Sequence, residues 1–183
     1  LQLKIDSVIT DLSLGTKADK FEAALQEIGS LLGYVSQRPD QKYQVGFDNL
    51  WALPDGVNFI GFECKNEVST TRDCITKNEV GQMNNHIGWF EKEYGTNRNI
   101  TYIHIHPTNA ISDKANYTRE VHVMTEKELN KLKKNIKGFI AEFSKYDLKN
   151  LTEDFISKAL ETHKLTSKDI RECYWVDPKH HLG

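Results

Sequence analysis

Cysteine and proline are scarce in this sequence. Only three cysteines, at positions 64, 74 and 173, and four prolines occur among its 183 residues. The cysteines form no Cys-x-x-Cys pair and are odd in number, which argues against a disulfide framework and against a ribbon-type zinc site. The few prolines exclude a collagen-like or low-complexity chain. This cysteine usage indicates a reducing, intracellular compartment.

Long apolar runs and an excess of one charge are also missing. No stretch of about 18 apolar residues occurs, and no apolar signal core follows a basic start. The sequence therefore predicts neither membrane insertion nor export, and it favours a cytoplasmic location. Its 24 basic and 26 acidic residues give a net charge of −2, which excludes a strongly basic, histone-like binder of nucleic acid. Any polyanion must therefore meet a local basic patch.

The residues that are present suit a compact domain. Hydrophobic residues make up 38% of the chain and aromatic residues 10%, which is enough to fill a core. The length corresponds to one domain of about 150 residues with an appendage. The chain begins at Leu1 rather than Met, which suggests a piece of a longer protein.

The spacing of apolar residues predicts helices separated by strands. Helical spacing of three and four occurs over residues 17–32, 75–95, 126–146 and 151–163. Aromatic and β-branched residues over 43–62, interrupted by Pro54-Asp55-Gly56, indicate a β-hairpin, and the alternation over 99–107 indicates one more strand. This order predicts an α/β domain with a small central mixed sheet flanked by helices, followed by a mostly helical C-terminal third.

Two acids and a lysine stand out on the predicted hairpin. Glu63 and Lys65 are two residues apart on one strand, so their side chains share a face. Antiparallel pairing can bring the carboxylate of Asp48, on the preceding strand, close to Glu63. Two carboxylates at this separation repel each other unless a cation lies between them, and Mg²⁺ or Mn²⁺ prefers such oxygen ligands. A metal that polarises a phosphate, with a lysine beside it, suits phosphodiester hydrolysis.

These residues also resemble a known family. Asp48 followed by Glu63-Cys64-Lys65 is similar to the D…(D/E)xK signature of the PD-(D/E)xK nuclease superfamily, which has the restriction-endonuclease-like fold. The likeness covers about residues 15 to 107 and includes Glu22 on the preceding helix and Gln82 on the following one. It departs at Phe47, where the family often has proline, and no recognisable pattern follows residue 110.

The resemblance implies a function for each of these positions. It implies a nuclease-like core over residues 1–110, with residues 111–183 as a helical extension packed on it as one unit. Asp48 and Glu63 would bind Mg²⁺ or Mn²⁺ with help from Glu22, while Lys65 would act as the catalytic lysine and Gln82 would position substrate or water. It also implies DNA as the substrate, a fused helicase, ATPase or recognition module as a partner, and a homodimer for double-strand cutting.

Other polar residues have simpler interpretations. Asp55 is expected to stabilise its turn, Glu67 only neighbours the motif, and Cys64 is expected in the core. The histidines at 104, 106, 180 and 181 are not expected to bind a functional metal. Lysines at 131, 133, 134, 137 and 145 make the segment 127–149 locally basic and able to contact phosphates, although a solvated helix face has the same pattern. Asn84, Asn85 and His86 are further candidate contacts.

Two other functions remain open from the sequence. One is a catalytically silent module of the same fold that binds nucleic acid or protein, because fold does not dictate function. The other is a ribonuclease that acts on structured RNA through the same residues.

Overall fold

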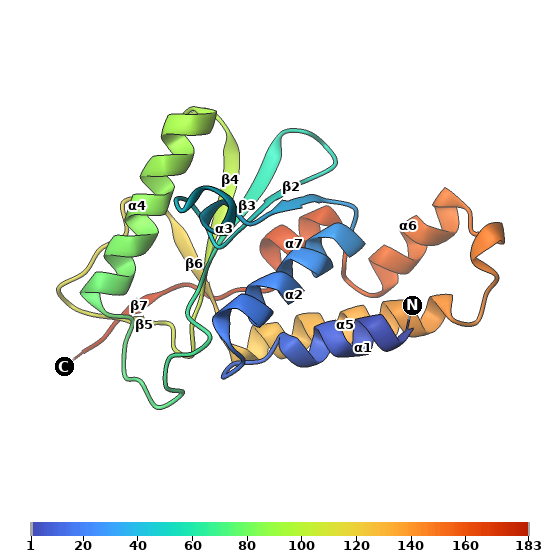
Figure 1. The fold of residues 1–183 in the computed structure, drawn as a ribbon, viewed down its shortest axis with the longest axis horizontal. Coiled ribbons are helices and arrows are strands. Elements are labelled where there is room, and N and C mark those ends of the chain that lie inside the picture. The colour runs from blue at the N-terminus through green and yellow to red at the C-terminus, as the bar shows by residue number, and fades with distance from the viewer. Residues whose placement is uncertain (1, 183) are drawn as a thin grey trace.

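A five-stranded mixed sheet forms the centre of the molecule. The computed structural model describes residues 2–182. The strands, in spatial order, are β1 (Val35–Gln37), β2 (Asn49–Ala52), β3 (Asn58–Cys64), β4 (Asn99–Ile105) and β6 (Val121–Met124) (Figure 1). The pairs β1–β2 and β2–β3 are antiparallel, whereas β3–β4 and β4–β6 are parallel. The carboxyl ends of β3, β4 and β6 therefore lie at the same edge of the sheet.

Helices cover both faces of this sheet. The face that packs the larger core is covered by α1 (Gln2–Asp11), α2 (Ala18–Leu31) and α5 (Glu126–Phe143), and the opposite face by α4 (Lys77–Tyr94). The smaller elements are α3 (Pro39–Tyr43), η1 (Leu148–Asn150), α6 (Glu153–Thr162), α7 (Ser167–Glu172) and a separate pair of strands, β5 (Ala110–Ile111) and β7 (Lys179–His180). This confirms the predicted α/β class with a small mixed sheet.

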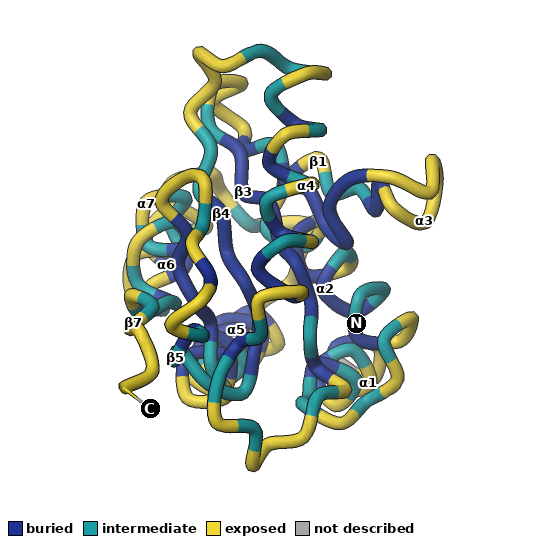
Figure 2. Tube along the Cα trace, turned by 90° about the vertical axis from the view of Figure 1, so that its left-hand side faces the viewer, coloured by how far each residue is buried: buried dark blue, intermediate teal, exposed yellow. Residues whose placement is uncertain are grey.

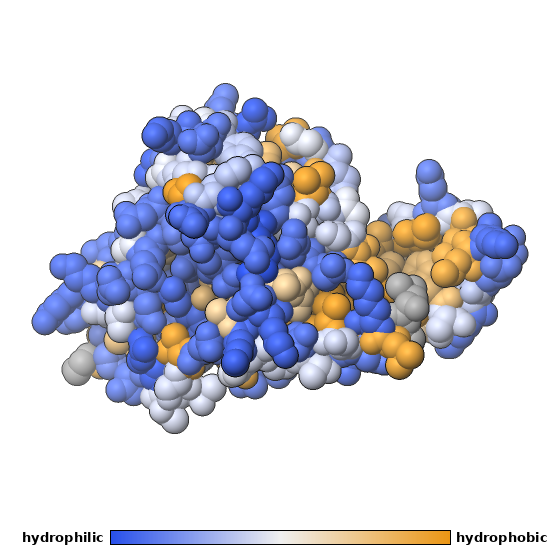
Figure 3. Space-filling model, in the orientation of Figure 1, coloured by the Kyte–Doolittle hydropathy of each residue, from blue (hydrophilic) through white to orange (hydrophobic). Residues whose placement is uncertain are grey.

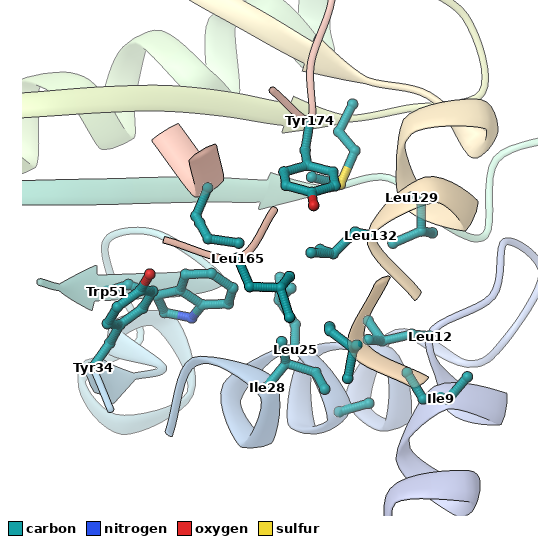
Figure 4. Packing of buried hydrophobic residues seen from close by; sticks show 14 of the residues in the cluster. Ile9, Leu12, Leu25, Ile28, Tyr34, Trp51, Leu129, Leu132, Leu165 and Tyr174 are labelled. Carbon is teal, nitrogen blue, oxygen red and sulfur yellow. The ribbon is translucent and has the colours of Figure 1, made fainter. Parts of the chain in front are cut away.

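Alternation along the strands divides the core into two main layers. Ile60, Phe62 and Cys64 of β3 join the larger cluster, and Phe59 joins the cluster under α4. The larger cluster also includes Trp51. Figure 4 shows part of this cluster, in which residues from α2 and α5 pack together. Figure 2 shows β3 and β4 buried along most of their length. The expectation that Cys64 is a core residue is confirmed.

The elements that the sequence predicts within residues 17–105 are all present in the structure. The helix expected at 17–32 is α2, the hairpin is β2 and β3, the helix expected at 75–95 is α4, and the strand is β4. The sequence did not predict α1, β1 or β6. β6 lies beyond residue 110 and pairs with β4, so the sheet takes strands from both sides of the boundary expected there.

The surface is mostly polar. Figure 3 shows hydrophilic residues over most of the visible face, with apolar residues more frequent toward α6. Exposed apolar side chains in that part include Tyr146, Leu148 and Ile156. Among residues 2–182, no helix has both the length and the apolar composition that a membrane span requires.

Candidate active site

The hairpin register places Asp48 beside Glu63. Asn49 pairs with Phe62, so the residue before Asn49 lies across from the residue after Phe62. Asp48 directly precedes β2, and its Oδ2 accepts a hydrogen bond from the Cys64 backbone N–H at 2.7 Å. This bond fixes the carboxylate of Asp48 against the end of β3. The proximity predicted from antiparallel pairing is therefore present.

Glu63 is held at both carboxylate oxygens. Its side chain is 3% exposed; Oε1 lies 3.1 Å from Lys65 Nζ, and Oε2 lies 2.5 Å from His86 Nδ1. Lys65 follows the end of β3, and its backbone N–H donates to Ile105 O at 2.8 Å, which keeps the chain attached to β4. His86 comes from α4, which packs over this face of the sheet. The carboxylate is thus fixed by one residue close in sequence and one distant residue.

Asp48 and Glu63 have opposite pKa shifts. Burial, and then the negative charge of Glu63, raises the pKa of Asp48 to about 8. Burial also acts to raise the pKa of Glu63, but the hydrogen bond and charge of His86 and the charge of Lys65 outweigh it, so the pKa of Glu63 is lowered. Lys65 is kept cationic, because Glu63, Asp48 and Glu79 raise its pKa against the opposing effect of burial. The site therefore holds one stabilised carboxylate and one that is costly to ionise.

A cavity of about 510 Å³ opens beside these groups. Asp48, Lys65, Glu22 and Arg72 are among the residues that line it. Glu22 comes from α2, and its Oε2 lies 2.6 Å from the Nη2 of Arg38, a buried arginine that also pairs with an aspartate of α2. The structure thus brings Glu22 to the wall of the same cavity as Asp48, while one of its oxygens is paired with Arg38.

Gln82 lies elsewhere. It is exposed on α4 and lines a separate hollow with Lys77, Asn78, Gly81 and Asn85. The side chain one helical turn later, His86, is the one that contacts Glu63. Of the five residues that the sequence proposes for catalysis and metal binding, Asp48, Lys65 and Glu22 line the cavity. Glu63 contacts Lys65 but does not line the cavity, and Gln82 lies outside it.

The remaining candidates have structural contacts. Asp55 Oδ1 accepts from two backbone N–H groups of its own turn, as expected. Glu67 lies beyond the end of β3, and its Oε2 accepts from the Ala18 backbone N–H at the start of α2. His104 is fully buried, with Nδ1 2.9 Å from the Tyr117 hydroxyl, and His106 is also fully buried.

Among the functional candidates, the sequence indicated His86 only as a possible contact of nucleic acid, and it did not single out Arg72. Their roles depend on contacts with residues 23 and 7 positions away. One signal was available for His86: it follows Gln82 by four residues and therefore shares its side of α4. Arg72 lies in a loop whose path no periodicity predicts.

The donor set suits a hard divalent cation. No three His, Cys, Asp or Glu side chains within residues 2–182 converge on a common point in the way a protein-only metal cage requires. Mg²⁺ seldom uses such a cage, because it keeps several waters and takes one or two carboxylates together with substrate phosphates. Asp48 and Glu22 line the cavity and match that requirement, and Glu63 lies next to Asp48 with its two oxygens paired to Lys65 and His86. The cost of ionising Asp48 is also the cost that a nearby cation offsets.

Comparison with models of protein families, with curated proteins and with solved structures gave no match.

Proposed function

We propose that this chain is a divalent-metal-dependent nuclease domain that hydrolyses DNA phosphodiester bonds, with a PD-(D/E)xK active site on a restriction-endonuclease-like fold. The observation that carries the proposal is the convergence of Asp48, Glu63 and Lys65, with Lys65 Nζ 3.1 Å from Glu63 Oε1. A charged pair of this kind is expensive to bury, and its lysine lines the cavity next to Asp48, so its position is better explained by chemistry than by stability.

Each residue has a distinct part in the proposed reaction. Asp48 and Glu63 would hold Mg²⁺ or Mn²⁺, with Glu22 as a further acid at the cavity wall. When bound, the metal polarises the phosphate and lowers the pKa of water. Lys65 remains protonated and held by Glu63, so it can orient the attacking water or stabilise negative charge on the phosphate oxygens. The water oxygen bonds to phosphorus and gives up a proton to solvent, one phosphorus–ester bond breaks, and the leaving oxygen takes up a proton from solvent.

The test is cleavage of supercoiled plasmid and of a labelled linear duplex with Mg²⁺ or Mn²⁺. We expect the wild type to cleave and Lys65→Ala to lose activity, with an unchanged circular dichroism spectrum. A matched RNA duplex separates deoxyribonuclease from ribonuclease activity. Cleavage by the wild type at the level of Lys65→Ala, with either metal, would contradict the proposal. In crystals soaked in Mn²⁺, we expect anomalous density beside Asp48 and Glu63.

A further inference from the structure

Arg72 lies on the wall of the cavity that contains Asp48 and Lys65. It belongs to the loop between β3 and α4, where hydrogen bonds to Ser69 organise a turn. The Arg72 backbone N–H donates to Ser69 O at 3.0 Å, and the Ser69 hydroxyl lies 2.9 Å from that of Thr71. The loop therefore presents Arg72 from a defined backbone position.

The side chain of Arg72 is fixed by an acid that is itself fixed. Arg72 Nη1 donates to both carboxylate oxygens of Glu79, each at 3.2 Å. Glu79 Oε2 accepts from the Thr76 backbone N–H at 2.7 Å and from the Thr76 hydroxyl at 2.9 Å, in the capping box that begins α4. The guanidinium is thus attached to the end of a helix, so binding a ligand would cost it little conformational entropy.

Only one nitrogen of the guanidinium takes part in this attachment. Across residues 2–182, no hydrogen bond involves Arg72 Nε or Nη2, and neither is a buried atom without a partner. The side chain is 35% exposed, so these two donors are accessible to a ligand. Nε and Nη2 form the edge of the guanidinium that pairs with two oxygens of a phosphate or carboxylate.

Arg119 shows how a purely structural arginine differs. Its Nε and Nη2 donate to the two oxygens of Glu91, and its Nη1 donates to Thr118 O. Every nitrogen of that guanidinium has a partner, and Arg119 does not line the cavity. Arg72 instead directs one nitrogen to its acid, leaves Nε and Nη2 without a hydrogen-bond partner, and lines the same cavity as Asp48 and Lys65.

We propose that Arg72 is a phosphate-binding residue that positions the sugar–phosphate backbone of the substrate strand through its Nε and Nη2 atoms. The inference depends on the proposed nuclease function for the class of substrate. Arg72 is expected to bind phosphates, because the nucleic-acid backbone presents pairs of anionic oxygens to any group beside the reacting bond. A contact of this kind fixes the register of the strand without reading its sequence.

The test compares Arg72→Gln, Arg72→Lys and Arg119→Gln in a Lys65→Ala background, so that the DNA stays intact. Binding to two labelled duplexes of unrelated sequence is measured by fluorescence anisotropy with Mg²⁺ over a range of KCl concentrations. We expect Arg72→Gln to weaken binding to both duplexes on the order of tenfold and to reduce the slope of log K against log[KCl] by about 1. Arg119→Gln should change neither quantity.

Arg72→Lys separates the phosphate contact from a contribution to folding. Lysine keeps the charge and the ion pair with Glu79, but it lacks the two-donor edge. We expect this variant to keep the salt slope and the thermal stability while losing affinity. Equal affinities and slopes for Arg72→Gln and Arg119→Gln, or absence of duplex binding in the background protein, would overturn the proposal. If binding depends on Arg72 but the protein with an intact Lys65 cleaves no DNA, the phosphate contact is upheld and the nuclease function is rejected.

Discussion

Asp48 and Glu63 are adjacent carboxylates with unequal surroundings. Glu63 has a cationic or hydrogen-bonding partner at each oxygen, whereas Asp48 has one backbone N–H. The charged form of Glu63 is therefore stabilised inside the protein, and that of Asp48 is not. This inequality makes stability depend on pH through Asp48.

We expect Asp48→Asn to stabilise the protein at neutral pH while abolishing cleavage. The pKa of Asp48 rises from an ordinary value of 3.8 to about 8 in the folded state, so the folded state binds more protons than the unfolded state in that interval. The stability contributed by the bound proton is complete below pH 4 and is lost as the pH rises through 8. The amide needs no proton, and it can still accept from Cys64.

Thermal unfolding of both proteins at pH 5, 7 and 9 without metal tests this expectation. The advantage of Asp48→Asn should grow between pH 5 and 8 and then level off. Each kcal/mol corresponds to about 2–4 °C in Tm for a chain of this size. Equal melting temperatures for both proteins at every pH would show that ionisation of Asp48 does not lower the stability of the folded state.

His86 is expected to position Glu63. Loss of a partner that orients a metal-binding carboxylate typically costs about 10–100-fold in metal affinity or activity. We therefore expect His86→Ala to raise the Mn²⁺ concentration needed for half-maximal cleavage by that factor, with little change in the KM for DNA. His86→Asn places an amide donor near the position of Nδ1 and should restore much of the loss. Failure of asparagine to rescue, with both variants folded, would contradict a positioning role.

The sequence predicted the local part of this site. Asp48, Glu63 and Lys65 come together through one hairpin, and its turn and alternation are visible in the chain itself. The contact of His86 with Glu63 depends on how α4 packs over the sheet, and no pattern in the sequence states that. The packing of α4 also decides which of its turns faces Glu63. That turn contains His86, and Gln82, one turn earlier, lies outside the cavity.

At the scale of elements, close packing of Phe47 against β3 fixes the start of β2. A Cβ atom built on Gly61 would lie 2.8 Å from Phe47 Cε2. Gly61 thus leaves room for the ring, and the residue after Phe47 is Asp48. The glycine therefore contributes to the position of a site residue through the ring that packs on it.

We expect Gly61→Ala to destabilise the protein by about 1–3 kcal/mol, the usual cost of overpacking a core. Cleavage should fall as well, because movement of Phe47 displaces Asp48. Gly88→Ala on α4 is the matched control, since no atom lies within 4 Å of its Cβ position and alanine favours a helix over glycine. Urea unfolding and plasmid cleavage measure both effects. A Gly61→Ala protein as stable and active as Gly88→Ala would show that Phe47 can shift freely.

Elements with strong periodicity were predictable, and short ones were not. α2, α4 and α5 each carry an apolar stripe over fourteen or eighteen residues, which is long enough to detect. β6 has four residues and includes a histidine, so its pattern is too short to identify from sequence. Its pairing with β4, across the fifteen residues between Ile105 and Val121, is a property of the whole fold.

At the scale of the molecule, metal binding to the proposed site should stabilise the entire domain. A ligand that binds only the folded state adds about 2.7 kcal/mol when its concentration is 100 times its Kd. We expect saturating Mn²⁺ to raise the Tm of the wild type by about 5–10 °C. The shift should disappear in the double variant Asp48→Asn, Glu63→Gln. An equal shift in both proteins, measured by calorimetry, would place the metal elsewhere.

The late position of β6 in the sequence also affects how the protein folds during its synthesis on the ribosome. Until Val121–Met124 has emerged, β4 lacks its second neighbour, and one side of it presents unpaired backbone donors and acceptors. If translation halts before that point, β4 is an exposed edge strand that can pair with another nascent chain. Completion of the sheet therefore waits for translation of the segment that follows the recognisable motif.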